Sequence, residues 1–195
     1  MSTQPIPKST AAEYLAFERE SEERHELVNG EIRLMSGASR EHNLIVFNLA
    51  SILHDELHDR RCEAYIVDMR VKIAANGVYT YPDASVVCGG PEFEDGIFDT
   101  LLNPNAIFEV LSKTTAAYGS GEKFTSYRNL PSLREYVLVS QDAPAVEHFV
   151  RLDDGAWRFN PVEGLDGEVQ LVTTEARIRL KDLYRRIVFD PPEHE

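Results

Sequence analysis

The strongest repeat of apolar positions in the chain runs through residues 39–59. Ile45, Leu49, Ile52 and Leu53 recur there at steps of one, three or four residues, which places them on one face of an α-helix. These side chains therefore form an inward-facing stripe. The pattern predicts a long helix that packs on the rest of the protein through that face.

Shorter apolar runs elsewhere predict strands. Thr10 and Glu13 form a capping box that begins a first helix, and Asn29-Gly30 between two apolar runs is a strong signal for a β-hairpin. Strands are predicted over residues 25–28, 31–35, 61–73, 84–88, 105–111, 135–140, 145–151, 156–160, 169–172 and 176–180, and a short helix over residues 122–129. These elements predict an α/β fold with a mixed central sheet, the long helix on one face, and a β-rich C-terminal tail that extends the sheet.

Length and charge limit the possible functions. A chain of 195 residues can bury a sizeable core as one domain, so a single domain over residues 1–195 is expected. The net charge of −13 opposes tight, nonspecific binding of nucleic acid, which would need a local basic patch, a divalent ion or both. The alternation of basic and apolar residues in the densest basic cluster favours a polar strand face over a DNA contact. That cluster contains Arg177, Arg179, Lys181, Arg185 and Arg186.

The cysteines and the N-terminus indicate the cellular compartment. Cys62 and Cys88 are the only cysteines, and their spacing fits neither a C-x-x-C motif nor a metal site. We expect two free thiols in a reducing cytoplasm. The N-terminus lacks the pattern of a signal peptide, and the longest nearly apolar stretch, residues 44–53, is far shorter than a membrane span. The sequence therefore predicts a cytoplasmic protein with no membrane partner.

Two carboxylates are notable because of the strands on which they occur. Pro82 restricts Tyr81 to an extended conformation, so Asp83 is expected at the mouth of the strand that follows. Glu109 lies inside an apolar run that is typical of a strand buried on both faces. Burying a carboxylate there costs free energy unless a cation pairs with it or strong hydrogen-bond donors contact it. Asp83 and Glu109 together therefore indicate an oxygen-ligand site for a hard divalent cation.

Short motifs also occur in a fixed order along residues 10–151. They are Arg24–Ile32, His42, Tyr81–Asp83, Glu109–Ser112, Gly121–Lys123 with Tyr127, and Arg134–Tyr136. A bare Pro-Asp pair carries little weight, but the ordered set is fairly specific. It resembles the Uma family of restriction-endonuclease-like proteins, a domain of unknown function within the PD-(D/E)XK nuclease superfamily. The resemblance implies a restriction-endonuclease-like fold, in which helices flank a mixed central sheet, and the activity of a hydrolase.

The resemblance further implies a site and its chemistry. Asp83 and Glu109 would hold Mg²⁺ or Mn²⁺ together with the carbonyl oxygen of Val110, and the ion would activate a water for attack on a phosphodiester bond of DNA. Leu111 stands where the superfamily has its lysine, two residues after the glutamate. Lys123 is therefore expected to take over the stabilisation of developing charge. Asp83, Glu109 and Lys123 are the expected catalytic residues of a metal-dependent endonuclease.

Four further residues are candidates for supporting roles: Glu26, His42, Ser112 and Tyr127. Glu26 either points into the site or lies on a solvated strand face. His42 is either an imidazole that faces the carboxylates or a histidine that forms a hydrogen bond near a helix start. Ser112 either contacts a phosphate or a metal-bound water, or is an ordinary turn residue. Tyr127 follows Lys123 by four residues and shares its helix face.

A second class of function fits the same sequence, namely a catalytically inactive nuclease-fold module for binding or protein interaction. The net charge of −13, Leu111, and Gly119, where the family commonly has an aspartate, favour this alternative. Asp83, Glu109 and Lys123 favour the enzyme. The expected partner is nucleic acid, with DNA ahead of RNA or another phosphodiester, and a homodimer is also open.

Overall fold

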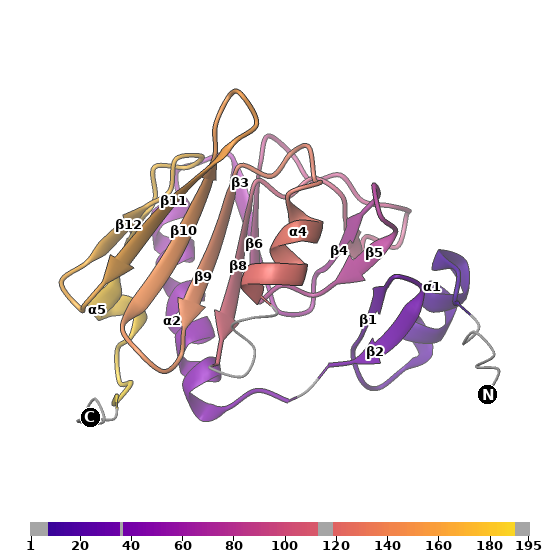
Figure 1. The fold of residues 1–195 in the computed structure, drawn as a ribbon, viewed down its shortest axis with the longest axis horizontal. Helices are drawn as coiled ribbons and strands as arrows, with labels where there is room; N and C mark the ends of the chain where they lie inside the picture. Colours follow the sequence, from indigo (N-terminus) through magenta and orange to yellow (C-terminus); the bar gives the residue numbers. More distant parts are fainter. Residues whose placement is uncertain (1–7, 36, 113–118, 190–195) are drawn as a thin grey trace, which may run out of the picture.

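The structure is a computed structural model and describes residues 8–35, 37–112 and 119–189. A six-stranded sheet forms the centre of the molecule, and a five-stranded sheet and a two-stranded sheet accompany it (Figure 1). The helices are α1 (Ala11–Glu20), α2 (Arg40–Leu57), a π-helical turn η1 (Gly119–Lys123) that continues into α4 (Phe124–Tyr127), and α5 (Leu180–Leu183). Within the described residues, no helix has both the length and the hydropathy needed to cross a bilayer.

The six-stranded sheet, called the central sheet below, has the strand order β11-β10-β9-β8-β6-β3. Its strands are β3 (Cys62–Ile66), β6 (Ala84–Cys88), β8 (Ala106–Leu111), β9 (Glu135–Ser140), β10 (Ala145–Arg151) and β11 (Trp157–Glu163). β8 and β9 run parallel, and their other neighbours pair in the antiparallel sense. The predicted α/β fold, with its mixed central sheet and a long helix on one face, is therefore confirmed.

The smaller sheets account for the remaining strands. The five-stranded sheet has the order β2-β1-β5-β4-β7. Its strands are β1 (His25–Val28), β2 (Glu31–Leu34), β4 (Arg70–Ile73), β5 (Val78–Thr80) and β7 (Thr100–Leu101). β12 (Glu168–Gln170) and β13 (Arg177–Arg179) pair only with each other in the described part of the chain. The predicted extension of the central sheet is thus right for β10 and β11 and wrong for β12 and β13.

The continuous strand predicted over residues 61–73 is also wrong. Val67 has a φ of +62°, which is a left-handed conformation that a β-branched residue rarely adopts. The chain therefore leaves the central sheet after β3 and enters the five-stranded sheet with β4. The pattern of apolar residues could not reveal this change of sheet, because the segments on both sides of Val67 are rich in residues that favour β-strands.

Local sequence signals explain the helix starts and the first hairpin. The Thr10 hydroxyl and the Glu13 carboxylate complete the predicted capping box of α1. The Ser39 side chain accepts a hydrogen bond from the His42 N–H and caps α2. Asn29 and Gly30 have φ values of +55° and +83°, as a two-residue hairpin turn requires.

Hydrophobic side chains pack on both faces of the central sheet. On one face, Ile45, Leu49 and Leu53 of α2 contact Phe108 and Val110 of β8 in one cluster. On the other face, a second cluster joins the central sheet to α4 and to the five-stranded sheet. Side chains of β8 alternate between these faces. Glu109, between Phe108 and Val110, therefore points toward α4 and the five-stranded sheet.

The expectation of two free thiols is wrong in this structure. Cys62 of β3 and Cys88 of β6 are direct partners in the antiparallel register, and they form a disulfide bond. The reason is the register itself, because cross-strand partners bring their Cβ atoms close together. Sequence spacing alone could not show that these two residues are paired.

Candidate functional site

The register of β6 and β8 brings the two predicted carboxylates together. Ala84 pairs with Phe108, so one further step in the antiparallel register places Asp83 opposite Glu109. The Asp83 Oδ2 atom accepts a hydrogen bond of 2.6 Å from the Val110 N–H. This contact fixes Asp83 beside β8 at the end of β6, where the Pro82-Asp83 pair predicted a strand mouth.

Glu109 is buried and is met by two donors from the η1–α4 segment. The Lys123 Nζ atom lies 3.1 Å from both carboxylate oxygens of Glu109. The Tyr127 hydroxyl donates a hydrogen bond of 2.9 Å to Glu109 Oε1. Lys123 ends the π-helical turn and Tyr127 ends α4, so both reach one carboxylate from the same side. A single π-helical turn within a helix is common at functional sites.

Glu26 of β1 is the second acidic partner of Lys123. Lys123 Nζ lies 3.1 Å from Glu26 Oε1, and the Glu26 side chain is 8% exposed. The Thr80 hydroxyl also donates to Glu26 Oε1 and lies 3.4 Å from the Tyr127 hydroxyl. Glu26 therefore points into the site, and the alternative of a solvated strand face is excluded.

His42 connects α2 to the carboxylate pair. Its Nε2 atom lies 2.9 Å from Asp83 Oδ1, so the imidazole faces the site rather than serving only the helix start. Asp83 and His42 are 16% and 22% exposed as side chains, against 5% for Glu109. The site is therefore open to solvent on the Asp83–His42 side and closed on the Glu109 side.

Burial and neighbouring charges shift the pKa values of these groups. Burial raises the pKa of Glu109 to about 7, and Asp83 and Glu26 add to this effect, although Lys123 opposes it. Burial would lower the pKa of Lys123, but Glu109 and Glu26 outweigh it and the pKa is raised. Burial also works against a charged His42, but the hydrogen bond to Asp83 and the negative charges of Asp83 and Glu109 together outweigh burial and raise the pKa of His42. The ammonium of Lys123 is thus firmly retained.

The structure places most of the predicted site residues around one point. Asp83, Glu109 and Lys123 come together, and Glu26, His42 and Tyr127 contact them. Ser112 follows β8 and is partly buried. Thr80 is the polar residue that sequence reasoning missed. The available signal was a hydroxyl at the end of a short β-rich run, just before the Tyr81–Asp83 motif.

The donor set is compatible with a divalent cation. Asp83, Glu109 and Glu26 offer carboxylate oxygens, which Mg²⁺ and Mn²⁺ prefer. A cavity of about 20 Å³ adjoins Glu26, Lys123 and Tyr127, enough for about one water molecule. No group of three or more His, Cys, Asp or Glu residues is gathered as a metal cluster within residues 8–35, 37–112 and 119–189. Asp83 and Glu109 would thus supply a partial coordination shell.

The sequence is similar to two cyanobacterial proteins from Synechocystis sp. PCC 6803. It is 39% identical to the uncharacterized protein sll1609 over 161 residues, which cover 83% of this chain and 91% of that protein. It is 32% identical to the uncharacterized protein slr1290 over 185 residues, which cover 95% of this chain and 96% of that protein. Both similarities extend over the strands that carry Asp83 and Glu109.

The fold is similar to a crystal structure of a protein from Anabaena variabilis that is described as a "putative nuclease". The TM-score is 0.75 at 19% sequence identity, and the match covers 94% of this chain and 100% of the other. A family model described as "Putative restriction endonuclease" matches residues 11–180, which include every residue of the site described above. The chain therefore belongs to the family that this model describes, Uma2.

Proposed function

We propose that the protein is a metal-dependent endonuclease that hydrolyses phosphodiester bonds of DNA. The observation that carries this proposal is the meeting of Asp83, Glu109 and Lys123 around one point. Family membership supports a nuclease-like protein, and the nuclease-like family makes nucleic acid the expected partner. The proposal adds to this that the nucleic acid is DNA, that a metal ion binds at the site, and that the protein cleaves its substrate.

Asp83, Glu109 and the Val110 carbonyl would hold Mg²⁺ or Mn²⁺. When bound there, the ion would polarise the scissile phosphate and lower the pKa of an attacking water. The substrate would approach from the Asp83–His42 side, because these side chains are the more exposed ones. The Asp83 carboxylate is already oriented for this task by His42 and by the Val110 N–H.

Lys123 would supply positive charge to the transition state. Its ammonium is held by Glu26 and Glu109 at 3.1 Å, so its position costs little reorganisation when charge develops on the phosphate. Tyr127 and Thr80 would keep the two glutamates in place through their hydroxyl groups. In this arrangement Lys123, at the end of η1, replaces the lysine that the superfamily has at the position of Leu111.

Cleavage of supercoiled plasmid tests the proposal. We expect nicking in the presence of Mn²⁺, none in EDTA, and none for Asp83→Ala with Mn²⁺. Tyr65→Phe is a matched control, since its hydroxyl contacts Glu63 on β3 and not the site, and it should cleave like the wild type. Nicking that persists at full rate in Asp83→Ala would contradict the proposal.

A nuclease-fold binding module without turnover is the second candidate. Both oxygens of Glu109 lie within 3.1 Å of Lys123, and both oxygens of Asp83 already have hydrogen-bonding partners. Such a site is satisfied without an ion. On this alternative the protein would retard an oligonucleotide in a gel yet leave plasmid intact with every divalent cation tested.

A further inference from the structure

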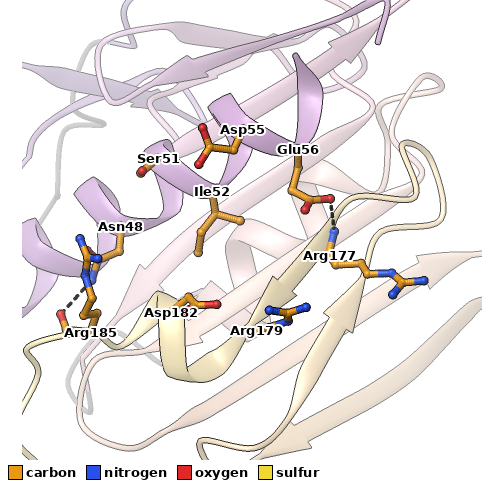
Figure 2. A pocket seen from close by; sticks show the side chains of 9 residues that line it. All are labelled: Asn48, Ser51, Ile52, Asp55, Glu56, Arg177, Arg179, Asp182 and Arg185. Atoms are coloured by element: carbon orange, nitrogen blue, oxygen red, sulfur yellow. Dashed lines mark hydrogen bonds between the residues drawn. The ribbon is translucent and has the colours of Figure 1, made fainter. Parts of the chain in front are cut away.

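A groove lies beside α2 (Figure 2), and none of the residues that line it belongs to the candidate site. Its volume is about 320 Å³, near the lower end of pockets that bind small molecules, about 300–1,000 Å³. α2 forms one wall, and the segment containing β13 and α5 forms the other. Its polar lining includes Ser51, Asp55, Glu56, Arg179, Asp182 and Arg185.

Arginines lie at the two ends of this groove (Figure 2). At one end, the Asn48 side chain donates to the backbone carbonyl of Arg185 at 3.0 Å. At the other end, the backbone N–H of Arg177 donates to Glu56 at 3.0 Å, and Arg179 lies toward this end (Figure 2). Asn48 and Glu56 are two helical turns apart, which separates the ends by about 12 Å along α2.

Acceptor and hydroxyl groups lie between the two arginines. Asp182 lies between Arg179 and Arg185, while Ser51 and Asp55 face the groove from α2 (Figure 2). Carboxylates and hydroxyls in this position can accept hydrogen bonds from hydroxyl groups. The groove therefore has arginines at both ends, with Glu56 beside Arg177 at one of them, and acceptors at its middle.

These charges do not neutralise one another across the groove. In the part of the chain that the structure describes, Arg185, Asp55 and Asp182 form no side-chain ion pair within 4.0 Å, and Arg179 has only Glu168 at 3.4 Å. Glu168 lies outside the groove lining. The protein has an excess of acids, with a net charge of −13, yet Arg185 forms no ion pair within the described residues although the groove also contains Asp55 and Asp182. A ligand that bridges the walls would pair both kinds of group.

We propose that this groove binds a small molecule with an anionic group at each end and hydroxyl groups between them, of the sugar bisphosphate class. The guanidinium forks of Arg179 and Arg185 would bind the terminal phosphates. Asp55 and Asp182 would accept hydrogen bonds from the hydroxyls. A long polyanion is disfavoured, because its further phosphates would meet Asp55 and Glu56.

This site goes beyond the proposed nuclease activity and does not depend on it. Calorimetry on the full chain, with fructose 1,6-bisphosphate, fructose 6-phosphate, fructose and inorganic phosphate as probes, tests it directly. We expect the bisphosphate to bind at least about tenfold more tightly than the monophosphate, since it makes one more charge-assisted contact. Fructose should give no measurable heat.

Variants of the two walls provide the controls. Arg185→Gln should reduce the affinity for the bisphosphate to that for the monophosphate, and Asp55→Asn should weaken both sugar phosphates without changing the binding of inorganic phosphate. Arg186→Gln is the matched control, because Arg186 is exposed and does not line the groove. Melting temperatures would show that each variant is folded.

Several results would overturn the proposal. They are the absence of bisphosphate binding at millimolar concentration, equal affinity for bisphosphate and inorganic phosphate, and an equal loss in Arg186→Gln. Displacement of the bisphosphate by a short oligonucleotide would assign the groove to nucleic acid instead. The first three results do not bear on plasmid cleavage, so the failure of one proposal is distinguishable from the failure of the other.

Discussion

Lys123 is the residue on which the charge balance of the candidate site depends. It lies 3.1 Å from both Glu26 and Glu109, and all three side chains are nearly buried. Removing one member of a buried ion pair typically costs about 3–5 kcal/mol, because it leaves an uncompensated charge. The same ammonium is the proposed source of transition-state stabilisation. On the proposed function, stability and activity therefore both depend on the Lys123 ammonium.

Lys123→Met separates these two roles when it is combined with a second substitution. Alone, it should lower the melting temperature, because Glu26 and Glu109 then face each other without a cation. Glu26→Gln added to Lys123→Met should restore much of the stability while plasmid cleavage stays about 10²–10³-fold below wild type. Thermal unfolding and plasmid nicking on the same samples measure both effects. Undiminished cleavage in Lys123→Met would remove Lys123 from the mechanism.

Glu109→Gln should stabilise the protein in a pH-dependent way when no metal is added. The pKa of Glu109 is raised from 4.5 to about 7 by burial, so the wild-type fold takes up a proton that the unfolded chain lacks. This contribution to stability is complete below about pH 4.5 and is lost as the pH rises through 7. As the pH rises from 4.5 to 7, the free energy of unfolding of the variant should therefore increase relative to that of the wild type, by up to about 3 kcal/mol. Denaturation in urea at pH 5 and pH 8 with EDTA measures it, and an equal difference at both pH values would contradict the pKa shift.

At the scale of elements, the pattern of residues along the chain predicted the helices and turns that local sequence signals determine. The repeat at Ile45, Leu49 and Leu53 gave α2, and Asn29-Gly30 gave the first hairpin. The pattern of apolar residues could not predict strand register. A repeat of two residues shows which face of the sheet a side chain occupies, but not which residue of the neighbouring strand lies opposite it. The pairing of Cys62 with Cys88, and the meeting of Thr80 with Glu26, depend on register and were therefore missed.

The same limit applied to the site. Asp83 and Glu109 could be selected because a carboxylate in an apolar run is costly, and family resemblance supplied Lys123. Patterning left open whether Glu26 and His42 face the site, because their segments allow either side. Hydrogen bonds to Lys123 and Asp83 decide both cases.

The disulfide between β3 and β6 should stabilise an edge of the central sheet. β3 is an outer strand, and the bond closes a loop between residues separated by 26 positions. A loop of this size contributes about 2–4 kcal/mol by restricting the unfolded chain. The double variant Cys62→Ala, Cys88→Ala should therefore unfold at lower urea concentration, and dithiothreitol should shift the wild type but not the variant. If unreduced, denatured protein contained two titratable thiols, the disulfide would be absent and the expectation of two free thiols would be correct.

Gly119 and Leu111 form a coupled pair between η1 and β8. A Cβ atom at residue 119 would lie 2.4 Å from Leu111 Cδ1, so Leu111 fills the space that a side chain at 119 would need. Gly119→Ala alone should cost about 1–3 kcal/mol through overpacking. In the Leu111→Ala background, the same change should cost less by at least about 0.5 kcal/mol. Urea denaturation of the four proteins gives this coupling, and strict additivity would show that the two positions are independent.

For the whole molecule, the net charge of −13 limits how tightly the proposed DNA substrate can bind. An acidic protein releases few counterions from DNA, so affinity should be low and its dependence on salt shallow. We expect a labelled duplex to bind with Mg²⁺ or Ca²⁺ and not with EDTA. Fluorescence anisotropy measures this, with Asp83→Asn as the control that should remove the effect of the cation. Equal binding in EDTA would place the DNA contact elsewhere on the surface.

The ion pairs of Lys123 also bear on how the protein matures. A protein whose ligand residues fold only around a metal, as in zinc fingers, cannot finish folding before the cell supplies that metal. Here an amino group of the chain itself already occupies the space between two acids. Synthesis and folding can therefore finish before any metal arrives. On the proposed function, a chelator would stop cleavage without unfolding the protein, and a rise in free divalent cation would start cleavage by protein that is already folded.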